Sequence, residues 1–199
     1  MFSTIKIATM TLLISLSGYH SFAQTEGTSE KKTKISVEID PATFAFGGYS
    51  AHLRLKPANW DHIQLGAGIY AMNFPDLFVG LNDNNKDKGW DVRLNLGVGL
   101  FGEYFFKEVN RGWFLGAQAS MQEYRIENSN AEGQSTFTNG LIMAYGGYSL
   151  QPFSFPLYFK PWAGVGYTDK ISGKNTVGDL TYDISPISMF ATLHIGYTF

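Results

Sequence analysis

The sequence contains no cysteine and no block of like charge, and each absence excludes a class of protein. Without cysteine there is no disulfide framework and no lipid anchor at a processed cysteine. Lys and Arg number 15 against 17 acids, and they are interspersed, so the basic stripe of a nucleic-acid-binding protein is missing. After the N-terminal region no apolar run is long enough for a spanning helix. If the chain crosses a membrane, it must do so as a closed β-barrel, in which strands satisfy every backbone group.

The first 23 residues have the pattern of a secretory signal peptide. Lys6 precedes an apolar run over residues 7–16, and the small-residue site at residues 21–23 comes before Gln24. This run is about ten residues long, whereas a spanning helix needs roughly 20. We therefore predict cleavage after Ala23, with a retained N-terminal anchor as the alternative. Residues 24–33 carry no apolar side chain and predict a flexible periplasmic lead-in.

From residue 34 onward, apolar side chains alternate with polar or small ones, as in strands that separate two environments. The expected strands cover residues 35–40, 49–56, 63–72, 90–106, 113–124, 135–150, 155–170 and 187–199. The last strand alternates throughout except at Phe190. Short and long connections follow each other in turn, as in outer-membrane barrels. The pattern predicts an all-β fold, a closed up-and-down antiparallel transmembrane β-barrel over residues 34–199. Eight strands are expected, six or ten are the alternatives, and the facing of residues 135–150 stays open.

The chain ends in Leu-His-Ile-Gly-Tyr-Thr-Phe at residues 193–199. This ending resembles the C-terminal signal by which the bacterial barrel-assembly machinery recognises outer-membrane proteins. With the signal peptide and the alternation, it makes the chain similar to the small eight-stranded outer-membrane barrels, the class of the OmpA transmembrane domain and OmpX. It looks most like the uncharacterised barrels of Bacteroidota. The resemblance covers residues 34–199 and implies an integral, monomeric protein of a Gram-negative outer membrane. Its partners would be outer-membrane lipids and the assembly machinery.

The polar faces of the strands, assigned inward, bring acids and bases together in the lumen. An eight-stranded barrel is just wide enough for side chains to fill it. Unpaired charges in that space would be costly, so we expect paired charges and amides to plug the lumen, with a conducting pore as the alternative. The predicted lumen charge network consists of Glu38, Asp40, His52, Arg54, Lys56, Asp91, Arg93, Glu103, Lys160 and His194.

Aromatic and apolar side chains outside this network suggest two further surfaces. An aromatic girdle at the membrane interfaces is predicted for Trp90, Tyr104, Phe106, Trp113, Tyr197 and Phe199. The longest outer loop, residues 73–89, carries Phe74, Leu77 and Phe78, which either form a binding patch or fold back on the barrel rim.

The same loop has an apparent calcium pattern, because Asp83, Asn85 and Asp87 alternate as oxygen ligands would. An EF-hand also needs Gly at position six and Glu at position twelve, and here these positions are Lys88 and Leu94. We therefore predict a solvated loop, with no metal and no cofactor.

Two known enzymes are small outer-membrane barrels, the lipid A deacylase and the lipid A palmitoyltransferase, so catalysis is worth testing. The deacylase motif places Ser two residues after His, whereas His52, His62 and His194 are followed at that distance by Arg, Gln and Gly. We predict no enzyme, and a structural or surface-binding role through the outer loops. The alternatives are a small passive or gated pore, a lipid-modifying barrel enzyme, and a soluble lipocalin-like carrier, which would need an apolar lumen.

Overall fold

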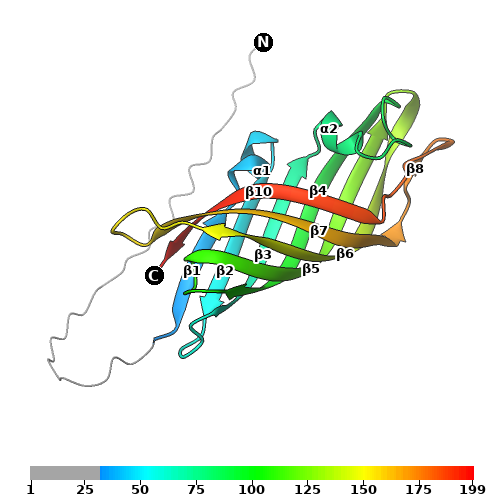
Figure 1. The fold of residues 1–199 in the computed structure, drawn as a ribbon. Helices are drawn as coiled ribbons and strands as arrows, with labels where there is room; N and C mark the ends of the chain where they lie inside the picture. Colours follow the sequence, from blue (N-terminus) through cyan, green and yellow to red (C-terminus); the bar gives the residue numbers. More distant parts are fainter. Residues whose placement is uncertain (1–31) are drawn as a thin grey trace, which may run out of the picture. The chain divides into compact units, whose positions relative to one another are not determined.

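The computed structural model describes residues 32–199, which form an antiparallel sheet closed into a barrel (Figure 1). The predicted signal peptide and nearly all of the predicted lead-in lie outside the described residues. The barrel strands are β1 (Lys34–Ile39), β2 (Tyr49–Lys56), β3 (Ile63–Asn73), β4 (Trp90–Phe105), β5 (Gly112–Asn128), β6 (Ala131–Ser149), β7 (Leu157–Gly173) and β10 (Ile187–Thr198). The connections hold helices α1 (Pro41–Ala45) and α2 (Asp76–Val79) and a hairpin of β8 (Thr176–Val177) and β9 (Leu180–Thr181). The eight-stranded barrel predicted from the alternation is confirmed. Among the described residues, no helix is long and apolar enough to cross a bilayer.

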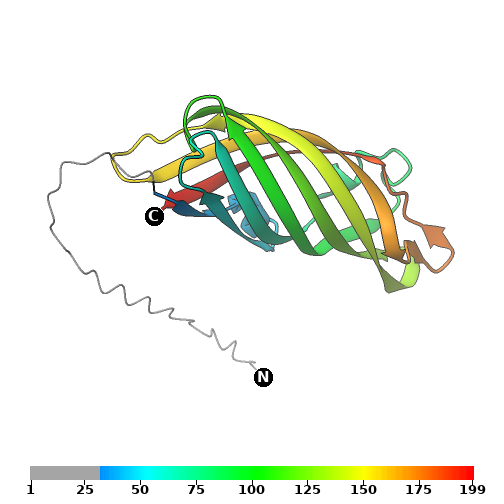
Figure 2. The same cartoon turned by 90° about the horizontal axis from the view of Figure 1, so that it is seen from below.

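The barrel has two different ends. The long connections, with α2 and the β8–β9 hairpin, lie at one end, and the short turns lie with the C-terminus at the other (Figure 1). We call these the loop end and the turn end. The strands tilt strongly along the barrel (Figure 2). Strands β4 to β7 have 16 to 19 residues, whereas β1 has 6 and β2 has 8. The wall is therefore tall on one side and short on the other.

The short side follows from Pro41, which cannot donate to a ladder and instead begins α1. Asp40 caps this helix, its carboxylate accepting from the Ala42 backbone N–H at 2.9 Å. Strand β7 pairs with all of β10 from Ile187 to Tyr197, whereas β1 pairs with β10 only from Ile195 onward. Helix α1, which contacts β10, β2 and β3, takes the place of the missing part of β1.

A β-bulge in β4 changes which side chains face inward. Leu94 pairs with Tyr124 and Leu96 with Glu123, so Asn95 is the extra residue on this strand. An extra residue reverses the period-2 alternation beyond it. Leu94 is 2% exposed and Leu96 is 41% exposed, although uniform alternation would place two residues at this spacing on the same face.

The bulge overturns three predictions. Trp90 was predicted in the outer aromatic girdle, but it is buried in the lumen together with Val92. Asp91 and Arg93 were predicted in the lumen charge network, but they lie on the outer face of β4 near the loop end. Arg93 Nη1 donates there to Asn73 Oδ1 at 2.5 Å. All three errors have one cause, because uniform alternation was assumed along the whole strand.

The remaining strands present an apolar outer face and a mixed inner face. In β6, whose facing the sequence left open, Ile142 is 70% exposed and Met143 is 4% exposed. Glycines on the inner face make room for large side chains from neighbouring strands. A Cβ at Gly196 would lie 2.3 Å from Tyr158 Cζ, and a Cβ at Gly116 would lie 2.5 Å from Tyr145 Cζ. Larger residues at these two positions would displace the tyrosines.

The bulge can be tested with single cysteines, because the chain has none of its own. In protein refolded into lipid vesicles, we expect Leu96→Cys to react with a bulky maleimide dissolved in the bilayer. We expect Leu94→Cys to be protected, because its side chain points into the lumen. Equal reaction at the two positions would mean that β4 alternates without a bulge.

Candidate functional site in the barrel interior

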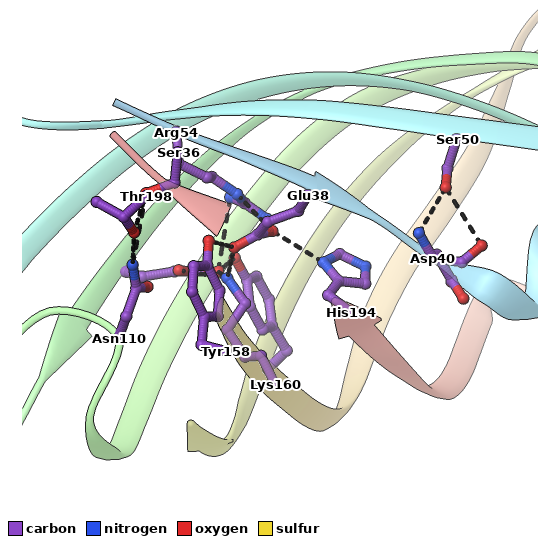
Figure 3. A network of polar contacts seen from close by, with 12 residues as sticks. Ser36, Glu38, Asp40, Ser50, Arg54, Asn110, Tyr158, Lys160, His194 and Thr198 are labelled. Carbon is purple, nitrogen blue, oxygen red and sulfur yellow. Dashed lines mark hydrogen bonds and ion pairs between the residues drawn. The ribbon is translucent and has the colours of Figure 1, made fainter. Parts of the chain in front are cut away.

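The centre of the interior is the Glu38 carboxylate, which lies on β1 and is completely buried. It accepts hydrogen bonds from Arg54 Nε at 2.9 Å, Lys160 Nζ at 2.5 Å and the Tyr158 hydroxyl at 2.8 Å. His194 Nδ1 lies 3.0 Å from its second oxygen, Oε2. Figure 3 shows these side chains converging on Glu38 from strands β2, β7 and β10. A buried carboxylate needs partners of this kind, because its desolvation is otherwise too costly.

A second buried carboxylate, Glu103 on β4, completes the cluster. Lys160 Nζ donates to both of its oxygens, at 3.0 and 2.9 Å, and so bridges Glu38 and Glu103. The Tyr145 hydroxyl donates to Glu103 at 2.8 Å, and Arg54 Nη1 lies 3.5 Å from it. Two acids therefore meet two bases, and the charges of these four side chains balance.

Aromatic side chains and a folded turn close the lumen below this cluster, toward the turn end. Phe105, Phe114 and Tyr145 pack together there. Asn110, in the turn between β4 and β5, donates from Nδ2 to the Thr198 hydroxyl at 3.2 Å and accepts from the Ser149 hydroxyl at its backbone oxygen at 2.9 Å. The turn thus joins β6 and β10 beneath the charges.

The other predicted members of the network lie apart from it. His52 is buried beside the cluster, its ring 4.7 Å from that of His194. Asp40 is buried higher up, where it caps α1 and accepts from the Thr192 hydroxyl at 2.8 Å. Lys56 lies at the turn end, where its Nζ is 3.3 Å from Asp61 Oδ1.

Sequence reasoning missed the two tyrosines that complete the cluster. Tyr145 and Tyr158 lie on the inner faces of β6 and β7 and donate to the two carboxylates. The sequence feature that could have indicated these tyrosines is a glycine on the adjacent strand. The Tyr145 ring covers Gly116, and the Tyr158 ring covers Gly196. A tyrosine aligned with a cross-strand glycine has room to lie along the inner wall.

Above the cluster, toward the loop end, the interior contains a cavity of about 90 Å³. Its polar part is formed around the Tyr70 hydroxyl, which accepts from Gln118 Nε2 at 3.1 Å and Gln122 Nε2 at 3.0 Å. Its apolar lining is Met72, Phe74, Leu94, Phe101, Leu141, Met143, Trp162 and Phe190.

Two outer connections, residues 74–89 and 174–186, fold over the tall side of the loop end and form what we call the lid. Val79 of α2 and Val177 of β8 are buried against Trp90, Val92 and Ile126, with Phe137 completing the apolar layer. The two connections are joined by Asn85, which donates to the Asp183 carbonyl oxygen at 2.8 Å and accepts from its N–H at 2.9 Å. Burial, together with the Asp183 carboxylate, raises the pKa of Tyr182 to about 12, so this phenol in the lid is neutral at physiological pH.

The lid differs from the solvated loop predicted from its composition, because Asn85 is 1% exposed. Of the candidate patch, Phe74 packs edge-on against Tyr124 and Phe78 contacts Phe46, whereas Leu77 is 73% exposed. Two of the three side chains therefore fold back on the barrel. Within residues 32–199, no group of three or more His, Cys, Asp or Glu side chains could hold a metal ion.

The other predicted girdle residues lie at the turn end. Tyr104, Phe106, Trp113, Tyr197 and Phe199 are exposed on the outer surface. Tyr104 packs against Phe106, and Tyr197 packs against Phe199, with ring centroids 5.6 and 5.0 Å apart. A band of aromatic side chains at this level is typical of a membrane interface.

The similarity of this chain to known proteins is weak. No protein-family model matches the chain, and no curated protein sequence matches it. Among solved structures, the N-terminal β-barrel domain of Pseudomonas aeruginosa OprF is similar, with 14% sequence identity and a TM-score of 0.41. The match covers 85% of this chain and 98% of that domain.

The charge cluster gives a stability prediction. Lys160→Met leaves two buried carboxylates with Arg54 as their one full cation, and we expect the free energy of unfolding to fall by about 3 to 5 kcal/mol. Arg125→Met is the control, because its ion pair with Glu127, with Arg125 Nε and Glu127 Oε1 3.4 Å apart, is exposed and should contribute about 0 to 1 kcal/mol. The measurement is denaturant unfolding in vesicles.

A double variant separates charge balance from packing. In Lys160→Met with Glu103→Gln, Arg54 and Glu38 remain as a matched pair, so part of the lost stability should return. Equal stability of Lys160→Met and Arg125→Met would rule out the Lys160 bridge as a stabilising contact.

Proposed function

We propose that this protein is a monomeric, integral β-barrel of a Gram-negative outer membrane, with a sealed lumen and a structural or surface-binding role. The contrast between its faces supports a membrane location. Leu53, Leu100 and Ile142 expose more than half of their surface on the outer face, while Glu38 and Lys160 are fully buried inside. A continuous apolar outer surface around a polar interior suits a barrel in lipid, and it would be an aggregation hazard in water.

The observation that carries the sealed lumen is the Lys160 bridge between Glu38 and Glu103. It fills the lumen from β1 to β4, and aromatic side chains close the barrel below it. Ions would have to break several buried contacts to pass, which disfavours the passive pore. We therefore place recognition at the loop end, where the lid exposes Leu77 and Leu81.

We assign no catalytic role to the interior histidines. His194 Nδ1 contacts Glu38, and the His52 ring lies between His194 and Phe101. Within the described residues neither histidine is hydrogen-bonded to a serine or threonine, so the nucleophile and base pair of a hydrolase is missing.

The proposal predicts the behaviour of the whole protein. It should co-sediment with outer membranes, resist carbonate extraction and migrate faster on gels before heating than after it. In planar bilayers the purified protein should show no steady conductance. Recovery in the soluble periplasm would refute the membrane assignment, and a stable open channel would favour the pore.

We also propose that β10 carries the signal for the barrel-assembly machinery. Phe199 is 71% exposed beside Tyr197, and its backbone N–H donates to the Ile35 carbonyl oxygen at 2.8 Å. Deleting Phe199 should reduce the amount of inserted barrel without affecting export. Trp113→Ala, which removes an exposed aromatic side chain from the same end of the barrel, is the control. Normal insertion of the truncated chain would place the signal elsewhere.

A further inference from the structure

Phe190, the one exception to the alternation of the last strand, lies at a gap in the barrel wall. It is on the part of β10 that has β7 on one side and no β1 neighbour on the other. Its ring points inward, with its centroid 5.8 Å from that of Trp162 on β7 and 6.0 Å from that of Phe78 on α2. An inward aromatic ring where the other positions are small or polar suggests an apolar contact at this gap.

A second hollow, beside the gap, connects the interior with the outside. It has a volume of about 300 Å³ and shares Phe74, Tyr124, Ser188 and Phe190 with the interior cavity. It is also lined by Ile187 and Met189, whose side chains point outward from β10. The passage therefore crosses the level of the wall between β10 and the lid.

The mouth of this passage is apolar. Ile187 and Met189 are more than half exposed on one side, and Leu81 of the lid is 62% exposed nearby. Phe44 and Phe46, from α1 and its end, are exposed on the other side of the gap. This surface is continuous with the apolar outer face of β10, so the passage opens toward lipid in the proposed orientation.

The inner end of the cavity offers hydrogen-bonding groups, and Asp40, a carboxylate elsewhere in the lining, already accepts from the Ala42 N–H and the Thr192 hydroxyl. Tyr70, Gln118 and Gln122 line it, and the buried His52 Nδ1 has no hydrogen-bond partner. Within residues 32–199, no Lys or Arg side chain lines the cavity, and Arg54 and Lys160 are already engaged with Glu38 and Glu103. A carboxylate or phosphate head group would lack a counter-charge here and would be costly to desolvate. A hydroxyl-bearing head group is uncharged, so it needs no counter-charge and can use these hydrogen-bonding groups.

We propose that the cavity binds a neutral single-chain amphiphile of the monoacylglycerol type, which enters sideways from the bilayer past Phe190. Its hydroxyl groups reach the Tyr70, Gln118 and Gln122 end, and its alkyl chain lies along Phe74, Phe78 and Phe190. This inference rests on the proposed membrane location. No bond is made or broken, so the site is one of binding or storage.

The test uses a monoacylglycerol with a diazirine in its acyl chain, incorporated into vesicles that contain the refolded full chain. After irradiation, mass spectrometry locates the labelled residues. We expect labelling at Leu141 and Met143, which face the cavity, and we expect excess unlabelled monoacylglycerol to remove it. Labelling at Ile142, which faces lipid, should not be affected by the competitor. Labelling confined to outward residues such as Ile142 would overturn the proposal.

A matched pair of variants tests the route. Ser188→Trp should fill the shared mouth and reduce labelling of Met143 by at least about tenfold, a loss of about 1.4 kcal/mol in binding free energy. Leu100→Trp, on the outer face of β4 and outside the lining of both hollows, should leave it unchanged. If both variants label like the parent, the ligand does not enter here. If Ser188→Trp does not fold, Phe190→Ala replaces it. Removal of the ring should then accelerate labelling of Met143, and an unchanged rate would refute the route.

Two further measurements separate the head-group preference and the membrane insertion from binding itself. The corresponding fatty acid, which carries a carboxylate, should label Met143 at least about tenfold less, and equal labelling would refute the preference for a neutral head group. Gel mobility before and after heating reports insertion in every sample. A parent chain that does not insert refutes the proposed location and the binding site with it, whereas an inserted parent without inward labels refutes the site alone.

Discussion

The Lys160 ammonium group lies between the carboxylates of Glu38 and Glu103, and the rest of the interior is arranged around this contact. In a space without bulk water, the repulsion between two carboxylates is offset when cations lie between them. Arg54 adds the second cation, and Tyr145 and Tyr158 donate to the remaining oxygen positions. The cluster joins strands β1, β2, β4, β6 and β7 at one level, so the lumen is filled by polar contacts between strands that are distant in sequence.

The alternation of apolar and polar residues was enough to predict the barrel, because the period of two is imposed by the backbone itself. It failed at β4, where one extra residue at Asn95 reversed the facing of the residues before it. Asp91, Arg93 and Trp90 were therefore assigned to the wrong face. A bulge leaves no reliable mark in a single sequence, since both halves of the strand alternate perfectly.

The cavity and the lid were also beyond sequence reasoning, for a different reason. Asn85 belongs to a polar stretch that reads as solvated loop, yet it is buried because it binds the Asp183 backbone some hundred residues later in the chain. Such pairing depends on two loops meeting over the same end of the barrel. Phe190 was visible in the sequence as an irregularity, but its neighbours Phe78 and Trp162 come from elements that only the fold brings together.

The pairing of β1 with β10 has a consequence for how the barrel forms. Glu38 and His194 are separated by 156 residues, yet they contact each other. The ring cannot close until the last strand has been made, so the Glu38 carboxylate remains hydrated until a late stage of folding. Contacts of such long range make folding slow. Closure of the ring and the approach of Lys160, Tyr158 and His194 to Glu38 are then one event.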